Sequence, residues 1–131
     1  MTLPNIDCEV EVLSPIHMSE DPEKVKKAIL NVFSGFNIKN QDFAAIAKTN
    51  NFQSMEKIHE VIHSTRSQRV LERQLEKHMN VNSTWFYLNK QAAFVNRIVL
   101  CEEADESPLG PLKIILTSRN INRVIESIIF E

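Results

Sequence analysis

The chain has 131 residues, of which 43% are hydrophobic and 24% charged, which suits one globular domain over residues 1–131 and excludes disordered, collagen-like and coiled-coil classes. The formal net charge of −2 removes whole-molecule attraction to nucleic acid or anionic lipid, so any polyanion site must be a local patch. Apolar runs are far shorter than a membrane span and the first 14 residues do not resemble a signal peptide, so we expect a cytoplasmic protein without a membrane partner.

The first third of the chain predicts a strand, a helix and a second strand. Apolar and acidic residues alternate over residues 6–12, which is the period of a half-buried strand. The Asp-Pro pair at residues 21–22 predicts a helix start, and Gly35 predicts the end of that helix. Over residues 36–48, an alternating apolar row that includes Phe43 favours a second strand.

Helical spacing of apolar residues resumes at Ser54 and continues to Met79, as one bent helix or two short ones. The run Thr-Trp-Phe-Tyr-Leu that follows is rich in β-favouring residues. The remaining predicted elements are strands over residues 84–88, 95–102 and 112–117 and a C-terminal helix capped by Ser118.

This element order, β-α-β-α-β-β-β-α, predicts an α+β fold. The last strands are joined by connections too short for helical crossovers, so we expect a largely antiparallel sheet with the helices on one face, a two-layer sandwich. Glu9 and Glu11 would lie together on the outer face of the first strand and repel each other. We therefore expect cross-strand contacts from one of them to Arg97 or Lys113.

Side chains with catalytic or metal-binding potential are few. Residues 59–63 read His-Glu-Val-Ile-His, the H-E-x-x-H pattern in which two His bind zinc and the Glu activates water. Polar flanking residues place His63 at a helix end. The candidate third ligands, Glu72, Glu76 and His78, lie on a segment predicted to be a sheet-covering helix and not a cleft wall, which favours a helix with both His at the core margin. No metal or other cofactor is expected. Cys8 and Cys101 do not form a C-x-x-C pair and are expected to be reduced core thiols.

Basic residues gather on one side of the helical pattern that follows the H-E-x-x-H motif. The four cations are Arg66, Arg69, Arg73 and Lys77. They lie opposite the apolar side that carries Leu71, and four long cations can follow phosphates without reading bases. The structural alternative is a solvated face in which Glu72 and Glu76 pair with these cations.

A second group of donors, Lys90 and Gln91, follows the aromatic run and precedes a predicted strand. We expect these donors to project from a sheet edge beside Trp85 or Tyr87. Aromatic side chains with nearby cations can stack on single-stranded bases. The alternative is that the aromatic residues lie in the core or in a dimer interface.

The predicted strand over residues 95–102 carries apolar residues on both faces, whereas helices should cover only one. An exposed patch of Trp85, Tyr87, Val99 and Cys101 would be large for a soluble monomer. Two-fold pairing is the commonest way to cover such a patch. We therefore expect a homodimer that buries part of the open sheet face.

Three blocks of the sequence together resemble a family. They are EDPEKVKKAILN at residues 20–31, NKQAAF at 89–94 and ESPLGP at 106–111. In this order they resemble an uncharacterised archaeal family of conserved small proteins. The resemblance implies an α+β fold similar to the ribosomal protein that binds 5S ribosomal RNA, a grouping with predicted RNA-binding proteins, and no enzymatic activity. Arg66 fits the family pattern, whereas Leu75 stands where members carry Arg.

Together these features predict a conserved, non-enzymatic protein that associates with RNA. The predicted RNA-binding residues are Arg66, Arg69, Arg73, Lys77, Lys90 and Gln91. A homodimeric protein-interaction module is the second alternative, and a zinc-dependent hydrolase that uses the H-E-x-x-H motif is the third.

Overall fold

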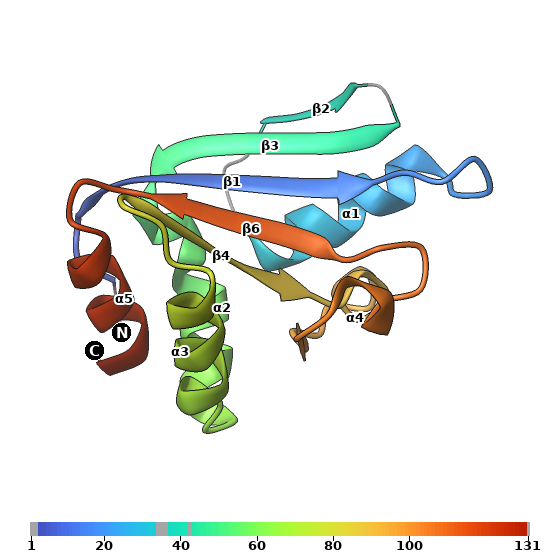
Figure 1. Cartoon of the computed structure of the whole chain (residues 1–131). Helices are drawn as coiled ribbons and strands as arrows, with labels where there is room; N and C mark the ends of the chain where they lie inside the picture. Colours follow the sequence, from blue (N-terminus) through green and yellow to red (C-terminus); the bar gives the residue numbers. More distant parts are fainter. Residues whose placement is uncertain (1–2, 34–36, 42, 131) are drawn as a thin grey trace.

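The computed structural model describes residues 3–33, 37–41 and 43–130; Gly35, the predicted end of the first helix, lies outside them. Six strands form one antiparallel sheet in the order β2-β3-β1-β6-β4-β5. Helices pack beneath one face of this sheet (Figure 1). The predicted α+β fold with a largely antiparallel sheet is confirmed. Among the described helices, none is long and apolar enough to cross a membrane.

The elements include one strand and one short helix more than predicted, when the predicted helical region over residues 54–79 is counted as two short helices. The strands are β1 (Asp7–Pro15), β2 (Asn37–Gln41), β3 (Ala44–Asn51), β4 (Ser83–Leu88), β5 (Leu100–Cys101) and β6 (Leu112–Thr117). The α-helices are α1 (Pro22–Val32), α2 (Glu56–Ser64), α3 (Gln68–Lys77), α4 (Lys90–Phe94) and α5 (Ile121–Phe130). Two short 3₁₀ turns are η1 (Phe52–Met55) and η2 (Ala104–Glu106).

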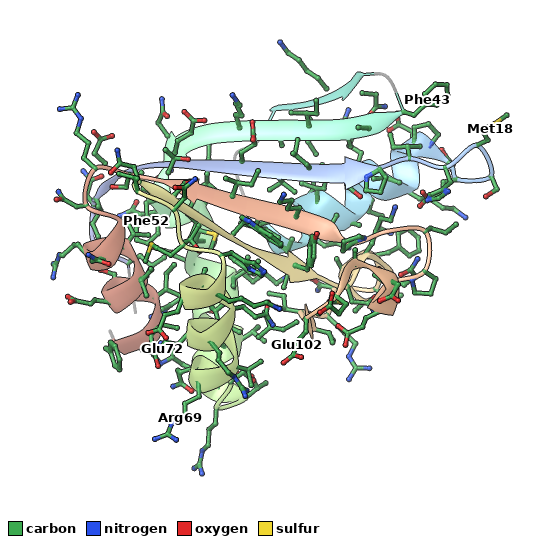
Figure 2. All side chains as sticks on the ribbon, in the orientation of Figure 1. Met18, Phe43, Phe52, Arg69, Glu72 and Glu102 are labelled. Atoms are coloured by element: carbon green, nitrogen blue, oxygen red, sulfur yellow. The ribbon has the colours of Figure 1, made fainter. Side chains whose placement is uncertain are left out.

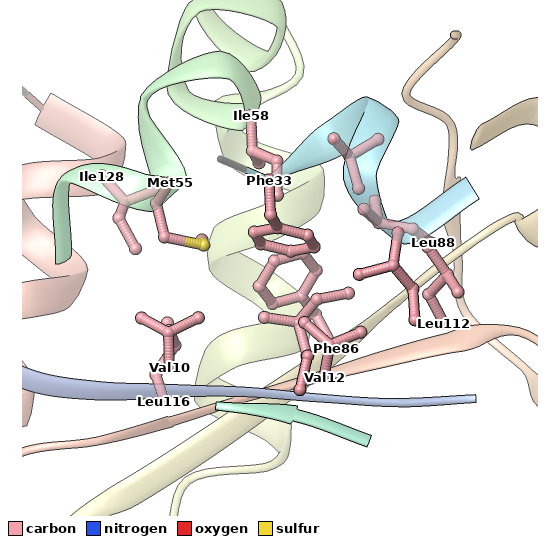
Figure 3. Packing of buried hydrophobic residues seen from close by; sticks show 14 of the residues in the cluster. Val10, Val12, Phe33, Met55, Ile58, Phe86, Leu88, Leu112, Leu116 and Ile128 are labelled. Carbon is pink, nitrogen blue, oxygen red and sulfur yellow. The ribbon is translucent and has the colours of Figure 1, made fainter. Parts of the chain in front are cut away.

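The core lies between the sheet and the helices (Figure 3). Along β1, β4 and β6 every second side chain is buried, among them Val12 and Phe86. Phe33, which follows α1, and the helical residues Ile58 and Ile128 cover this row from the other side. Burial of alternate strand positions is what one covered face of a sheet requires, so the period-two pattern predicted the inward face correctly.

Local capping explains both the first and the last helix. The Asp21 carboxylate accepts the backbone N–H of Glu23 at 3.0 Å, and Pro22 occupies the first helical position as predicted. The Ser118 hydroxyl oxygen accepts the backbone N–H of Asn120 at 3.1 Å before α5. Both helix starts were therefore readable from sequence.

The single strand predicted over residues 36–48 is wrong, because two strands, β2 and β3, form a hairpin there. The chain turns at Phe43, which has φ of 64° and is 77% exposed. Phe43 was predicted to lie in the apolar row, but a residue at a turn leaves the alternation of the strands beside it. Ala45 and Ala47 do face the core.

The region after β3 forms two short helices, α2 and α3, which is one of the two predicted alternatives. The helical segment begins before Ser54, with a 3₁₀ turn whose start is capped by Asn51. The chain breaks between α2 and α3 at Arg66, whose φ of 55° cannot continue a helix. Met79, predicted on the apolar side, lies beyond the end of α3 and is 36% exposed.

The strand predicted over residues 95–102 is present only at Leu100–Cys101, so its predicted extent is wrong. Only Leu100–Cys101 pair with β4, and the preceding residues form α4 and an irregular segment. Asn89 caps the start of α4 by accepting the N–H of Ala92 at 2.9 Å. The Asn31 amide of α1 donates to the carbonyls of Ala93 and Phe94 at 2.9 and 3.0 Å. A tertiary contact thus completes this short helix.

The acidic outer face of β1 is compensated from β3. Lys48 lies 3.7 Å from Glu9 and 3.2 Å from Glu11, and the hydrogen bond to Glu11 raises the pKa of the Lys48 ammonium. The predicted partners were Arg97 and Lys113, but Arg97 lies outside the strands. The expected cross-strand pairing exists, but its cation is Lys48.

Candidate RNA interface

The four predicted cations of the α2–α3 region, Arg66, Arg69, Arg73 and Lys77, are all exposed; we call them the basic stripe. Arg66 lies in the turn before α3, and the other three lie on α3. The opposite side of α3 buries Leu71 and Leu75 in the core. Figure 2 shows Arg69 at the end of the helical layer farthest from the sheet, pointing away from it. The stripe therefore faces solvent and is held by a helix that the core fixes in place.

Most of the stripe makes no ion pair. Within the described residues, Arg66, Arg69 and Arg73 make no ion pair, and Lys77 lies 3.9 Å from Glu103, with both side chains largely exposed. The structural alternative was pairing with Glu72 and Glu76; the described residues show no such ion pair, although both carboxylates line one pocket with Arg69 and Arg73. Unpaired guanidinium groups are free to bind phosphate oxygens in a bidentate manner.

The stripe ends at an aromatic stack. His78, the residue after α3, stacks its ring on Trp85 with 3.4 Å between ring centroids and 12° between ring planes. The His78 Nδ1 also donates to the Trp85 carbonyl at 3.0 Å. The Lys113 ammonium lies 4.3 Å from the Trp85 ring centroid, and Tyr87 lies 4.9 Å away. The sequence proposed an aromatic and cationic combination here; the structure supplies Lys113 and His78 as its partners instead of Lys90 and Gln91.

Beside this stack the surface is hollowed by a cavity of 280 Å³ that we call the α3 hollow. Its lining residues are Arg73, Gln74, Lys77, His78 and Glu102. Sequence reasoning missed Gln74, His78 and Glu102 as members of one site. A polar Gln74 on the apolar side of an amphipathic helix was the available signal. Glu102 comes from a distant segment and had no local signal.

Lys90 does not project from a sheet edge, and that prediction is wrong. It begins α4 and is only 3% exposed. Its ammonium donates to the Pro15 carbonyl at 2.8 Å, the Glu20 carboxylate at 3.0 Å and the Leu109 carbonyl at 2.7 Å. Burial lowers the pKa of the Lys90 ammonium, while the hydrogen bond and charge of Glu20 oppose that shift. All three protons are engaged, so Lys90 is not available to RNA; we call this group the Lys90 cluster.

Gln91 is exposed, but its side chain makes hydrogen bonds to the loop that contains Ser107 and Pro108. Its amide nitrogen donates to the Pro108 carbonyl, and its amide oxygen accepts from the Ser107 hydroxyl at 3.0 Å. The same hydroxyl accepts the Lys90 N–H at 3.1 Å. The structure thus joins Gln91 to the Lys90 cluster, and α4 packs against α1, not against the basic stripe.

The H-E-x-x-H motif does not form a metal site. Both ring nitrogens of His63 are engaged, since Nε2 donates to the Ile128 carbonyl at 2.9 Å and Nδ1 accepts from Gln68 at 3.2 Å. His59 is buried, and its ring lies 4.3 Å from that of His63. Burial is the larger cause that lowers the pKa of His59, and the charge of the neighbouring His63 lowers it further. Among the described residues, no group of three His, Cys, Asp or Glu is placed to hold a metal ion.

The two cysteines are buried free thiols, as predicted. They lie in β1 and β5, which are separated by two strands of the sheet. Burial raises the pKa of each thiol to about 11. Cys101 is 3% exposed, so it does not belong to the exposed apolar patch that was predicted with Trp85, Tyr87 and Val99.

Comparison with known proteins identifies the family of this chain. A family model described as RNA binding matches residues 9–119. The chain is 39% identical to a UPF0201 protein of Methanothermobacter thermautotrophicus, covering 90% of this chain and 88% of that one. It is 29% identical to one from Metallosphaera sedula, covering 89% and 84%.

Solved structures of related proteins share this fold. The crystal structure of a UPF0201 protein from Methanococcus jannaschii superposes with a TM-score of 0.77 at 30% identity, over 92% of this chain and 98% of that one. A second UPF0201 crystal structure gives a TM-score of 0.78 at 29% identity, over 94% of each chain. The chain therefore belongs to the UPF0201 family, whose relatives here are archaeal proteins.

Proposed function

We propose that this protein binds RNA without catalysis and that the basic stripe makes the phosphate contacts. The observation that carries the proposal is that Arg69 and Arg73 on α3 and Arg66 in the turn before it are exposed and make no ion pair with the described residues, in a chain of net charge −2. The family model described as RNA binding supports the ligand class. Arg66, Arg69, Arg73 and Lys77 are the residues we assign to it.

The geometry suits a strand of phosphates. Arg69 and Lys77 are eight residues apart on α3, which is about 12 Å at 1.5 Å per residue. Contacts of this kind position RNA but do not read its sequence. Because the overall charge is slightly negative, attraction must come from this local patch and should weaken with salt.

Filter binding across a salt series tests the proposal. Four phosphate contacts to a single strand predict a slope of log affinity against log salt of about −3. The double variant Arg69→Glu with Arg73→Glu should halve this slope and lower RNA affinity by about tenfold or more at low salt. The matched control, Lys39→Glu with Arg119→Glu, changes the net charge equally at exposed cations outside the stripe.

The two variants separate a local interface from a general charge effect. Equal loss of RNA affinity in both would show that only net charge matters and would remove the stripe from the interface. Absence of salt-dependent RNA binding by the wild-type protein would overturn the proposed function.

A homodimer through the open face of the sheet is the second candidate. Half-buried apolar side chains on that face, among them Leu13, Ile46 and Ile115, favour it. The face also carries Glu11 and Lys113, so its apolar area is interrupted by charge. Sedimentation at micromolar concentration tests this candidate, and Ile115→Lys should dissociate the dimer; a wild-type monomer would reject it.

A further inference from the structure

The α3 hollow contains a polar group with no partner. Gln74 is 4% exposed, and neither its amide nitrogen nor its amide oxygen has a hydrogen-bond partner within the described chain. A buried polar group left unsatisfied costs about 1–3 kcal/mol. Every other polar side chain that lines the hollow is exposed or half-buried. The amide is therefore a donor and acceptor pair that a bound molecule could satisfy.

The walls of the hollow carry three complementary chemistries. Arg73 and Lys77 present cations, Glu102 presents a carboxylate, and His78 presents a ring already stacked on Trp85. The cavity of 280 Å³ lies just below the usual range of about 300–1,000 Å³ for ligand pockets. This volume suits one flat heterocycle better than a larger ligand.

We propose that the α3 hollow holds one unstacked base of single-stranded RNA, an inference that rests on the proposed RNA binding. The base stacks on His78 and extends the stack with Trp85. Its polar edge exchanges hydrogen bonds with the Gln74 amide and, where it carries an amino group, donates to Glu102. The flanking phosphates lie on Arg73 and Lys77, which also belong to the basic stripe.

The same hollow discriminates against duplex RNA. Bases in an A-form duplex are stacked and paired, so their Watson–Crick edges are not available to a side-chain amide. Stacking on aromatic side chains contributes about 1–3 kcal/mol per base in single-strand binding proteins. The site therefore favours loops and single strands, whereas the phosphate contacts of the stripe alone would accept both.

Trp85 makes this testable, because it is the one tryptophan in the sequence. Its emission is followed during titration with octanucleotides of A, C or U and with a 16-base-pair RNA duplex. We expect single strands to change the emission and to bind about tenfold more tightly than the duplex at equal salt. A mixture of the four nucleoside monophosphates forms a further arm of the experiment.

The decisive variant is Gln74→Leu, with Gln53→Leu as control at an exposed glutamine outside the hollow. Gln74→Leu should weaken single-strand binding by about tenfold while the duplex affinity and the salt slope stay unchanged. Its thermal midpoint should equal or exceed that of the wild type, since an unsatisfied amide is removed. The control should leave both measurements unchanged. Glu102→Ala, at an exposed loop position, should reduce the preference among the three octanucleotides without altering stability.

The outcomes distinguish the proposed base site from the proposed RNA binding on which it rests. Salt-dependent RNA binding with equal affinity for single and double strands, unaffected by Gln74→Leu, would keep the stripe and reject the base site. Monophosphates that bind as tightly as the octanucleotides would reject a site for RNA strands in favour of a free-nucleotide site. No RNA binding at all would reject both proposals.

Discussion

The Lys90 cluster and the α3 hollow each bring a cation and a carboxylate together from distant segments, yet they are used in opposite ways. In the Lys90 cluster each of the three ammonium protons meets an acceptor of the protein. In the α3 hollow the cations face solvent, and the buried Gln74 amide meets no partner. A buried polar group whose hydrogen bonds are all satisfied within the protein stabilises the fold, whereas one with unsatisfied hydrogen bonds is available to a ligand.

This difference decides between residues that the sequence treated alike. Lys90 and Arg73 were both predicted to bind RNA, from the type of side chain and its neighbours. Lys90 is buried and has three hydrogen-bond acceptors, so it stabilises the fold, whereas Arg73 is exposed on the surface. The predictions below test that separation through stability, where the two regions should respond differently.

The largest effect is expected from Glu20→Gln. Lys90 is 4% exposed and Glu20 11% exposed in side-chain area, so removing the carboxylate leaves a buried charge without its counterion. Loss of one partner of a buried pair typically costs about 3–5 kcal/mol, measured here by urea unfolding. Adding Lys90→Met should recover most of this loss. A single variant that unfolds at the wild-type urea midpoint would contradict the role of the cluster.

A smaller loss is expected from Gly110→Ala, in the loop that supports the same cluster. Gly110 has φ of +88°, and an added Cβ would lie 2.3 Å from the Pro15 Cγ. Positive φ with this clash should destabilise the protein by about 1–3 kcal/mol in urea unfolding. Leu109→Gly, at the neighbouring φ of 65°, should leave stability unchanged or raise it. Equal unfolding midpoints for wild type and Gly110→Ala would show that the loop relaxes freely.

His59 supplies a pH-dependent test. Burial lowers its pKa below the ordinary 6.5, so below that pH the unfolded chain binds more protons than the folded one. The contribution is fully present above pH 6.5 and is lost as the pH falls from there toward the folded-state pKa. Urea unfolding from pH 7.5 to 5 should therefore show a smaller loss in His59→Leu than in wild type. The exposed His17→Leu serves as control, and parallel profiles for wild type and His59→Leu would refute the mechanism.

The smallest stability effect is expected from Arg73→Ala. The side chain is exposed and unpaired among the described residues, so its removal should change the unfolding free energy by less than about 0.5 kcal/mol. RNA affinity should fall in the same protein, which Glu20→Gln should not reproduce at temperatures where it is folded. A large stability loss in Arg73→Ala would erase the contrast between the two regions.

The fold was predictable where local signals and periodicity agreed. In α1 the Asp-Pro start and the inward row of Val25, Ala28 and Ile29 lie in one continuous segment. In α4 the five helical residues depend on hydrogen bonds from Asn31 of another helix, and this distant contact is not visible in the local sequence. The apolar residues that follow α4 were predicted as a strand. A short helix has too few internal hydrogen bonds to dominate its own sequence pattern.

The candidate site could likewise be predicted only where its residues lie close together in the sequence. Three members of the basic stripe, Arg69, Arg73 and Lys77, repeat every fourth residue along α3, so they share a face in any folded state that contains the helix. Arg66 lies in the turn before that helix. The α3 hollow draws Glu102 from a segment 25 residues beyond Lys77, and no spacing along the chain encodes that approach. The zinc pattern was locally complete, yet the packing of α2 against α5 and α3 engages both ring nitrogens of His63, one with Ile128 and one with Gln68.

The sequence by itself determined the antiparallel α+β class, the inward faces of β1, β4 and β6, the caps of α1 and α5, and the exposed cations of α3. Each follows from interactions within a few residues or from a period that one covered face imposes. The tertiary structure alone decided that Lys90 is buried, that His78 stacks on Trp85 and that Gln74 remains unpartnered. Those outcomes depend on which distant groups arrive within hydrogen-bond distance, and that is set by the packing of the whole chain.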